Sequence, residues 1–466
     1  MSKYDNESIR ALKGADRVRK RPQVIFGSDG LEGCTHAVFE IVSNAIDEAR
    51  AGYGRVINIT KYKDGSVKVE DFGRGMPVDY NTVEERYNWE LLFCELYAGG
   101  KYNKGEENYE YALGLNGLGL CATQYSSEWM HADIYRDGYH YHLDFEKGEN
   151  IGGMVKTPFG GRRTGSVIHW KPDPEVFTDT NVPSDYYRDT LKRQAVVNKG
   201  IVINFTDETE LVPETGKIRK DTWVYNEGLT GYIKELTNEE NITAVREFTS
   251  EAMAKDKDDQ EPYRVKMNCA FTFSNNIQTL EYYHNSSWLE YGGSPDQAVK
   301  TAFVSAVDAY LKNKGLYKSG EAKINFSDIQ DCLVFVSSCF SSVASYENQT
   351  KKAINNKGIT KVMTDFLKRN LETYFIEHPE EAGKIADQVL VNKRSREHAV
   401  KARDTVKKAL SIQNTMATRV EKFVDCRCKD PKKRELYIVE GDSALGSVKL
   451  GRDAEYQAIM PIRGKR

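Results

Sequence analysis

The sequence predicts a mixed α/β fold with several domains. Segments with apolar residues at every third or fourth position, the helical period, lie between short segments in which apolar and polar residues alternate, as in strands. The chain is also long: its 466 residues correspond to about three domains of roughly 150 residues each. We therefore expect the elements to group into more than one α/β unit.

The first expected domain covers residues 1–217. Apolar periodicity predicts a helix over 36–50, and alternation predicts strands over 56–60 and 66–71. Asp64-Gly65 separates these strands and predicts a hairpin with a type I′ turn, because both residue types tolerate positive φ. A patch of Pro, Thr and Gly then indicates the end of the domain.

A second α/β domain is expected over residues 218–410. Its predicted strands cover 264–274 and 333–337, and its predicted helices cover 297–312, 358–370 and 380–410. The last helix contains a basic segment: Lys393, Arg394, Arg396, Lys401, Arg403, Lys407 and Lys408. A solvated helix face is the favoured interpretation of this segment, and contact with DNA phosphates is the alternative.

Residues 411–466 are expected to form a linker and the beginning of a third domain. The LYIV sequence at 436–439 is typical of a short buried strand. Too few residues follow this strand to complete a domain, so we expect the sequence to be a fragment.

Composition narrows the functional classes. Lys and Arg number 66 against 69 Asp and Glu, a net charge of −3, so the whole molecule does not attract DNA or an anionic membrane, although a local patch can. No apolar run reaches the roughly 18 residues of a membrane span, and the polar N-terminus is not a secretory signal. The eight cysteines are scattered, and Cys426-x-Cys428 lacks the second pair of a zinc site. We expect a soluble cytosolic protein without a membrane partner.

The helix predicted over 36–50 carries the first candidate chemistry. Glu40, Asn44 and Glu48 recur at every fourth position and share one stripe of the helix. A glutamate and an asparagine one turn apart can position a water molecule and a hydrated Mg²⁺ ion. The solvent face of an amphipathic helix explains the same stripe, and from this segment alone we favour that interpretation.

Two glycine-containing segments follow. The sequence VEDFGRGMP ends a strand in Asp71 and continues in glycines that let the backbone approach a ligand, so Asp71 can accept from the amine of a base. A turn capped by Asp is an equal alternative. Residues 98–119 hold six glycines and Lys101, which suit a phosphate nest or a flexible loop, and they match neither a P-loop nor a dinucleotide fingerprint.

The order of these motifs resembles the GHKL ATPases, a superfamily that includes gyrase, Hsp90, histidine kinases and MutL. The E-x-x-x-N helix precedes D-x-G-x-G, a lid ending in G-x-x-G-x-G, and Thr164-Gly165-Ser166. Three other segments are an N-terminal stretch with Tyr4 and Ile9, the tripeptide Gln349-Thr350-Lys351, and LYIVEGDSA at 436–444. They are similar to the N-terminal arm, the QTK loop and the start of the TOPRIM domain in the B subunits of type IIA topoisomerases, DNA gyrase and topoisomerase IV.

The resemblance implies a GHKL (Bergerat) sandwich of sheet and helices, a ribosomal-S5-like transducer domain and a truncated TOPRIM domain. It also implies ATP and Mg²⁺ as cofactors. Glu40 would activate the attacking water, Asn44 would bind Mg²⁺ and Asp71 would bind the adenine amine. Lys351, assisted by Gln349, would reach the γ-phosphate. The other implied nucleotide contacts are Gly75, Met76, Lys101, Tyr109, Gly114, Leu115, Gly117, Leu118, Gly119 and Ser166.

The implied function is an ATP-operated gate for double-stranded DNA. ATP would dimerise the protein through the arm of Tyr4 and Ile9. With the A subunit, in an A2B2 heterotetramer, the gate would supercoil or decatenate DNA in the bacterial cytoplasm, at the nucleoid. Glu440 would belong to the metal site for DNA cleavage, but the later D-x-D of that site is absent from the sequence. We therefore expect no cleavage by this chain alone.

Some positions depart from the family pattern and keep alternatives open. Ser43 stands where Asp is usual, the lid reads LGLNGLG, Ser166 replaces Thr, and Leu445 replaces a glycine. No catalytic group is lost, but a divergent paralogue is possible. A MutL-like DNA clamp and an Hsp90-like chaperone share the nucleotide site, although neither is expected to carry LYIVEGDSA. A catalytically silent, nucleotide-gated interaction module is not expected to retain Glu40.

Overall fold

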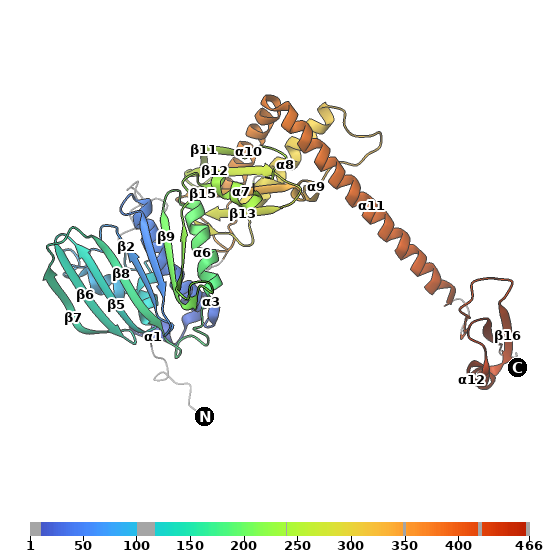
Figure 1. Cartoon of the computed structure of the whole chain (residues 1–466), viewed down its shortest axis with the longest axis horizontal. Coiled ribbons are helices and arrows are strands. Elements are labelled where there is room, and N and C mark those ends of the chain that lie inside the picture. Colours follow the sequence, from blue (N-terminus) through green and yellow to red (C-terminus); the bar gives the residue numbers. More distant parts are fainter. Residues whose placement is uncertain (1–10, 100–116, 239, 348–350, 418–421, 463–466) are drawn as a thin grey trace. The chain divides into compact units, whose positions relative to one another are not determined.

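The computed structural model describes residues 11–99, 117–238, 240–347, 351–417 and 422–462, with the backbone alone over 408–417. The chain forms two compact units, Met1–Val389 and Leu390–Arg466. Each unit combines helices with strands (Figure 1), which confirms the predicted mixed α/β class.

An eight-stranded sheet forms the first part of the first unit. Its strand order is β10-β9-β1-β2-β8-β5-β6-β7, with β1 and β9 parallel. The strands are β1 (Val56–Lys61), β2 (Val67–Asp71), β5 (Ser127–Arg136), β6 (Tyr139–Glu146), β7 (Glu149–Pro158), β8 (Gly165–Pro172), β9 (Val202–Leu211) and β10 (Ile218–Trp223). A small hairpin joins β3 (Tyr80–Asn81) to β4 (Arg86–Tyr87).

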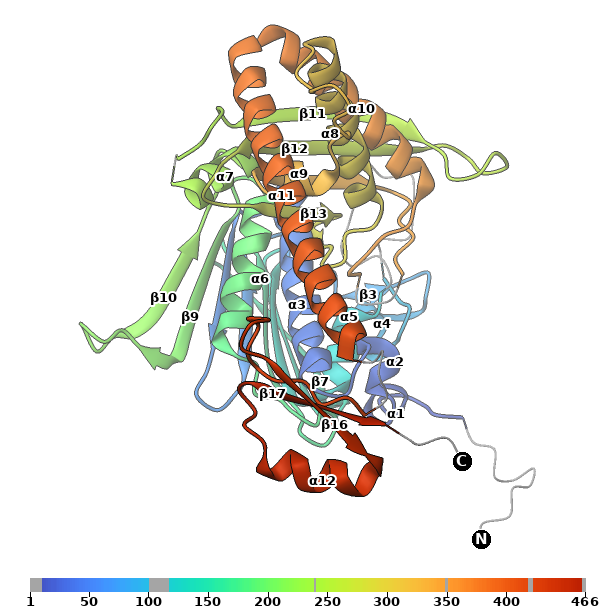
Figure 2. The ribbon, with the colours of Figure 1, turned by 90° about the vertical axis from the view of Figure 1, so that its right-hand side faces the viewer.

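Helices pack on one face of this sheet and bury its alternate apolar residues. Figure 2 shows α3 and α6 in front of the sheet. The helices of this layer are α1 (Asp16–Arg19), α2 (Pro22–Phe26), α3 (Leu31–Arg50), α4 (Asn88–Cys94), α5 (Gly119–Tyr125) and α6 (Ser184–Val197). Because strand side chains alternate between faces, Val67, Val69, Ile168 and Trp170 enter the core while their neighbours face away from the helices. The expected sandwich of sheet and helices is confirmed.

The predicted hairpin between β1 and β2 is present, but its turn is not of type I′. Gly65 has a φ of 82°, whereas Asp64 is not among the residues with positive φ. The Gly65 N–H donates to Tyr62 O over 3.1 Å, and the Ser66 N–H donates to Asp64 Oδ1 over 3.0 Å. The Asp64 side chain therefore caps the turn, and a single glycine supplies the left-handed residue.

The second part of the first unit contains a five-stranded sheet of order β11-β12-β15-β13-β14. Its strands are β11 (Arg246–Ala254), β12 (Tyr263–Phe273), β13 (Thr279–His284), β14 (Ser287–Trp288) and β15 (Leu333–Ser341). Its helices are α7 (Leu229–Thr237), α8 (Ser294–Asn313), α9 (Phe326–Gln330) and α10 (Lys357–Glu377). Phe271 packs edge-on against Phe303 of α8 and Tyr374 of α10, with ring centroids 5.6 and 5.8 Å apart.

Two predicted features of this region differ from the structure. The boundary expected at 217–218 falls at the start of β10, which pairs with β9 and belongs to the first sheet. The strand predicted over 333–337 extends to Ser341, because β12 pairs with it along the whole stretch from Leu333 to Ser341. The last strand of the first sheet in chain order, β10, therefore ends at Trp223, six residues beyond the expected boundary.

The second unit contains β16 (Glu435–Glu440), α12 (Gly441–Gly451) and β17 (Gln457–Ile462), with the two strands parallel. The predicted strand exists, but its predicted burial is wrong: Leu436 and Ile438 are 54% and 60% exposed. In the described residues its sheet has two strands and one accompanying helix, which leave much of the strand uncovered.

The long polar helix is confirmed as α11 (Pro379–Ala417), which starts in the first unit and continues into the second. Lys393 is fully buried and its Nζ lies 3.3 Å from Glu397 Oε1, so this cation is not presented to solvent. Lys401, Arg403 and Lys407 are exposed, as a solvated helix face requires.

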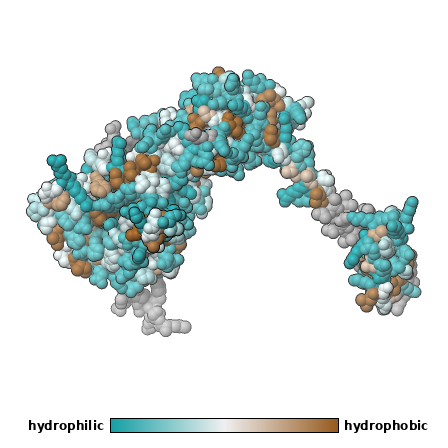
Figure 3. Space-filling model, in the orientation of Figure 1, coloured by the Kyte–Doolittle hydropathy of each residue, from teal (hydrophilic) through white to brown (hydrophobic). Residues whose placement is uncertain are grey.

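The described helices include none with the length and apolar character that a membrane crossing requires. On the face drawn in Figure 3, hydrophobic residues are scattered among hydrophilic ones.

Candidate active site

Helix α3 presents a polar stripe to a cavity of about 280 Å³ on the helical side of the first sheet. Glu40, Asn44 and Glu48 all line this cavity. The opposite side of the helix is anchored by apolar residues that are buried in the core, among them Val38, Ile41, Val42 and Ala45. The interpretation of the stripe as a solvent face is therefore wrong, because the stripe forms one wall of a cavity.

Asp71 forms a second wall at the end of β2. Its Oδ1 accepts a hydrogen bond from the Gly73 N–H over 2.8 Å. Burial raises the pKa of Asp71 to about 6; backbone hydrogen bonds from Gly73 and Ser166 oppose this rise, and the charge of Glu48 adds to it. Asp71 is thus an ionised hydrogen-bond acceptor at neutral pH, held in a partly desolvated position.

The segment after Asp71 is fixed by contacts with β5 and β8. Gly75 has a φ of 79°, and a Cβ there would lie 2.6 Å from Tyr135 O, so this position requires glycine. The Arg136 guanidinium donates to Gly75 O over 2.7 Å, and the Met76 N–H donates to Ser166 Oγ over 3.3 Å. Gly75, Met76, Arg136 and Ser166 consequently line the cavity as one connected group.

Gly119, the first residue of α5, lies directly against Glu40. A Cβ at position 119 would lie 2.1 Å from Glu40 Oε2, closer than any real contact. Gly117 and Leu118 line the same cavity, and the φ of Gly117 is 58°. Helix α5 thus begins directly after these residues and brings their backbone next to the Glu40 carboxylate.

His36 holds the other side of Glu40. Its Nε2 lies 3.1 Å from Glu40 Oε1, and its Nδ1 lies 3.2 Å from Phe26 O. The imidazole is therefore fixed between α2 and the Glu40 carboxylate, one helical turn away. Sequence reasoning did not single out His36, although its position four residues before Glu40 was a readable signal.

Arg74 and Arg136 were also missed as cavity residues. Arg74 Nη2 lies 2.9 Å from Glu48 Oε1, and its guanidinium carbon lies 4.1 Å from the centroid of the Tyr53 ring. This ion pair neutralises Glu48 at the cavity wall. The two arginines add positive charge to a site that otherwise carries the carboxylates of Glu40, Glu48 and Asp71.

The structure brings together nine of the residues that the sequence predicted for the site. They are Glu40, Asn44, Asp71, Gly75, Met76, Gly117, Leu118, Gly119 and Ser166. Seven others lie outside the described residues: Tyr4, Ile9, Lys101, Tyr109, Gly114, Leu115 and Gln349. The remaining two predicted site residues are described but do not line the cavity. They are Lys351, and Glu440 at the end of β16 in the second unit.

Lys351 belongs to a loop whose ends are tied together. The Glu347 N–H donates to Ala353 O over 3.1 Å, and the Asn355 N–H donates to Ser345 O over 3.0 Å. Lys351 itself has a φ of 58°. These bonds pair residues 345–347 with residues 353–355, on either side of the segment that contains Lys351.

The composition of the cavity suits an adenine nucleotide with a divalent cation. Asp71 offers an ionised acceptor for an exocyclic amine, and the arginines and glycine-lined backbone suit phosphate oxygens. Asn44 and Glu40 offer the oxygen ligands that Mg²⁺ prefers.

The chain is similar to known proteins over its whole length. It is 33% identical to the DNA gyrase B subunit of Thermotoga maritima over 466 residues, which cover 100% of this chain and 71% of that protein. It is 32% identical to the DNA gyrase B subunit of Mycoplasma genitalium, over 99% of this chain and 70% of that protein. The family model for DNA gyrase B matches residues 228–405. The chain belongs to the DNA gyrase B family.

Solved structures of this family have the same fold. The 43K ATPase domain of Thermus thermophilus gyrase B, in complex with an aminocoumarin, matches with a TM-score of 0.63 and 26% identity, over 84% of this chain and 98% of that chain. The topoisomerase IV ATP-binding domain of Francisella tularensis, in complex with a small-molecule inhibitor, matches with a TM-score of 0.61 and 27% identity, over 83% and 98% of the two chains. The GHKL ATPase fold of the family is thus confirmed.

Proposed function

We propose that the chain binds and hydrolyses ATP in the cavity between α3, β2 and α5, as the B subunit of a type II DNA topoisomerase. Membership of the gyrase B family supports the function. The observation that carries the proposal is that one cavity is lined by Glu40 and Asn44 of α3, Asp71 of β2 and Gly119 of α5, three segments that lie far apart in the sequence.

Each residue has a chemical task in this proposal. The Asp71 carboxylate accepts a hydrogen bond from the adenine amine. The connected group of Gly75, Met76 and Ser166 supports the adenine ring. The backbone at Gly117, Leu118 and Gly119 approaches the phosphates, assisted by Lys101, Tyr109, Gly114 and Leu115. Asn44 would hold Mg²⁺, which supplies positive charge for the phosphate oxygens.

Glu40 is the proposed general base. A water molecule attacks the γ-phosphorus, Glu40 takes a proton from that water, and the bond to the β,γ-bridging oxygen breaks to release ADP. His36 holds one oxygen of the carboxylate, so the other, next to Gly119, is directed into the cavity. Lys351, with Gln349, would contact the γ-phosphate and couple the nucleotide to the second sheet.

The same proposal extends to partners. ATP binding would dimerise the chain through the arm with Tyr4 and Ile9, and hydrolysis would release the dimer. With the A subunit in an A2B2 heterotetramer, the dimer would pass one DNA duplex through another at the bacterial nucleoid in the cytoplasm. Glu440 would belong to a TOPRIM metal site, in the proposed region 411–466, after a transducer domain that ends near residue 410.

Substitution of the base tests the catalytic assignment. Glu40→Gln keeps the size of the side chain and removes the base, so we expect ATP affinity within about threefold of the wild type. We expect the ATP turnover rate to fall by roughly 10²-fold or more, since general acid–base catalysis typically accelerates a reaction by about 10²- to 10⁴-fold. ATP affinity is measured by equilibrium binding and turnover by phosphate release.

Glu128→Gln is the matched control for this test. Glu128 is a partly buried carboxylate that pairs with Lys171 over 3.1 Å and does not line the cavity, so this variant should hydrolyse ATP normally. Normal hydrolysis by Glu40→Gln would contradict the assignment of Glu40 as the base.

A further inference from the structure

Histidines are concentrated on the face of the first sheet that lies opposite the helices. The chain has eight histidines, and four of them, His131, His140, His142 and His169, come from the adjacent strands β8, β5 and β6. The intervening residues Met130, Ala132, Leu143 and Ile168 are buried in the core. Since side chains alternate along a strand, the four histidines project from the sheet face that the nucleotide cavity does not use.

Strand register places carboxylates between these histidines. His131 of β5 is directly opposite Asp144 of β6, and Asp133 is directly opposite His142. Directly opposed residues have their Cβ atoms about 4.5 to 5.5 Å apart, so short polar side chains on one face meet. The arrangement therefore follows from the alternating H-x-D and H-x-H-x-D sequences of two paired strands.

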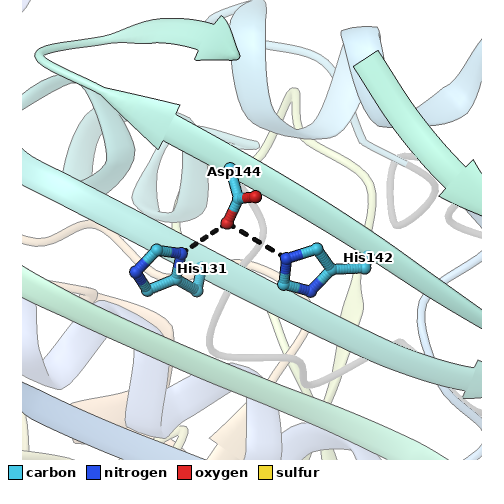
Figure 4. A group of neighbouring side chains, drawn as sticks. All are labelled: His131, His142 and Asp144. Atoms are coloured by element: carbon cyan, nitrogen blue, oxygen red, sulfur yellow. Dashed lines mark hydrogen bonds and ion pairs between the residues drawn. The ribbon is translucent and has the colours of Figure 1, made fainter. Parts of the chain in front are cut away.

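The side chains form a continuous chain of contacts (Figure 4). His131 Nδ1 lies 2.5 Å from Asp144 Oδ1, and the same oxygen lies 3.1 Å from His142 Nε2. On its other side, His142 Nδ1 lies 2.8 Å from Asp133 Oδ1, which also lies 2.7 Å from His140 Nε2. His142 is thus the central member, with a carboxylate at each ring nitrogen.

We propose that His131, His142 and Asp144 bind a divalent transition-metal ion of the Zn²⁺ class. One nitrogen or oxygen atom from each of the three side chains lies within 4.8 Å of the others. Four ligands at roughly 2.0 to 2.1 Å around zinc are about 3.3 Å apart, so small side-chain rotations suffice. Two imidazoles and a carboxylate form a donor set that zinc uses, with a fourth position left for water.

A neighbouring carboxylate favours this set of ligands. When His142 uses Nε2 for the metal, its Nδ1–H donates to Asp133, which fixes the tautomer and the orientation of the ring. Asp133 is fixed in turn by His140. The five side chains therefore supply both the ligands and the hydrogen bonds that orient the central ligand, which is the arrangement found around metal-binding histidines.

Stability of the sheet alone does not explain the cluster. The five side chains are between 27% and 45% exposed, and exposed ion pairs are typically worth about 0 to 1 kcal/mol.

Metal titration of the full chain tests the proposal. The metal-stripped protein is titrated with Zn²⁺ alone by calorimetry and with Co²⁺ by visible absorption. We expect the wild type to bind one ion more than the double variant His131→Gln/His142→Gln. Asp133→Asn should keep that stoichiometry and lose roughly 10- to 100-fold in affinity, as expected for a residue that orients a ligand.

Matched controls exclude other histidines and the cysteines. The double variant His378→Gln/His398→Gln removes two histidines outside the cluster and should bind Zn²⁺ as the wild type does. Circular dichroism should show that all variants fold. Equal Zn²⁺ binding by the wild type and His131→Gln/His142→Gln would overturn the proposal, as would loss of the site in Cys426→Ser/Cys428→Ser. Because the cluster is separate from the nucleotide cavity, this result is independent of ATP hydrolysis.

Discussion

Gly119 and Glu40 show how a single side chain position can control the site. The absence of a Cβ at 119 leaves space for the Glu40 carboxylate, and His36 holds that carboxylate from the other side. Glu40 is therefore confined between a glycine and an imidazole, which orients the proposed base before a nucleotide binds.

We expect Gly119→Ala to reduce ATP turnover by roughly 10²-fold, because the new methyl group displaces Glu40 by about 1 Å or more. Gly160→Ala is the control, since a Cβ there meets nothing within 4 Å. Steady-state phosphate release measures both variants. Equal turnover of Gly119→Ala and Gly160→Ala would show that the position of Glu40 is unimportant.

The raised pKa of Asp71 predicts that the protein's preference for adenine over hypoxanthine nucleotides depends on pH. Its pKa is raised from 3.8 to about 6, so the carboxylate is ionised above pH 6 and becomes protonated as the pH falls through this value. The ionised form accepts from the amine of adenine, whereas the protonated form donates to the oxygen that inosine carries there. We expect the preference for ATP over inosine triphosphate to decrease roughly tenfold between about pH 7.5 and pH 5.

Competition binding at several pH values measures this preference. The ratio of the two affinities cancels the protonation of the phosphates, which both nucleotides share. Asp71→Asn should make the ratio independent of pH. A ratio that changes equally in the wild type and in Asp71→Asn would assign the effect to another group.

At the scale of elements, the loop that carries Lys351 is held by the N-cap of α10. Asn356 is buried, and its Oδ1 accepts from the Ser345 N–H over 2.7 Å, while its Nδ2 donates to Asp256 Oδ2 over 2.7 Å. Asp256 Oδ1 also accepts from the Gly358 N–H over 2.7 Å. One asparagine thus joins the start of the loop, the start of α10 and the segment after β11.

We expect Asn356→Ala to lower the free energy of unfolding by about 1 to 3 kcal/mol, because it removes a buried amide that bonds to the Ser345 N–H and to the Asp256 carboxylate. Urea denaturation measures the loss. ATP turnover should also fall, since the stem of the Lys351 loop loosens. The adjacent Asn355 is exposed, so Asn355→Ala should change neither quantity. Equal free energies of unfolding for Asn356→Ala and Asn355→Ala would contradict the anchoring role of Asn356.

At the scale of the whole molecule, the proposed gate predicts that nucleotide binding doubles the molecular mass of the protein in solution. We expect the chain to be monomeric alone and dimeric with Mg²⁺ and a non-hydrolysable ATP analogue, as measured by light scattering after size-exclusion chromatography. Glu40→Gln should form the same dimer with ATP itself, because it binds ATP without hydrolysing it. An unchanged mass despite measured nucleotide binding would be consistent with the proposed nucleotide site but would contradict the proposed ATP-operated gate.

Local sequence patterns determined much of this protein. Periodicity predicted α3, α8, α10 and α11, because helix and strand periods are properties of consecutive residues. The motifs around Glu40, Asp71 and Gly119 predicted a nucleotide site, because the residue types that such chemistry needs occur in short, ordered segments. Their family resemblance then predicted the fold of the first sheet and its helices.

Tertiary packing decided what these patterns left open. The stripe on α3 faces a cavity and not solvent, β10 completes the first sheet, and β16 is exposed, because each outcome depends on which distant segment packs alongside. The same holds for Arg136 at the Gly75 carbonyl and for the histidine cluster, whose members meet through strand register. Sequence periodicity shows which residues share a face, but only strand pairing and layer packing determine what that face meets.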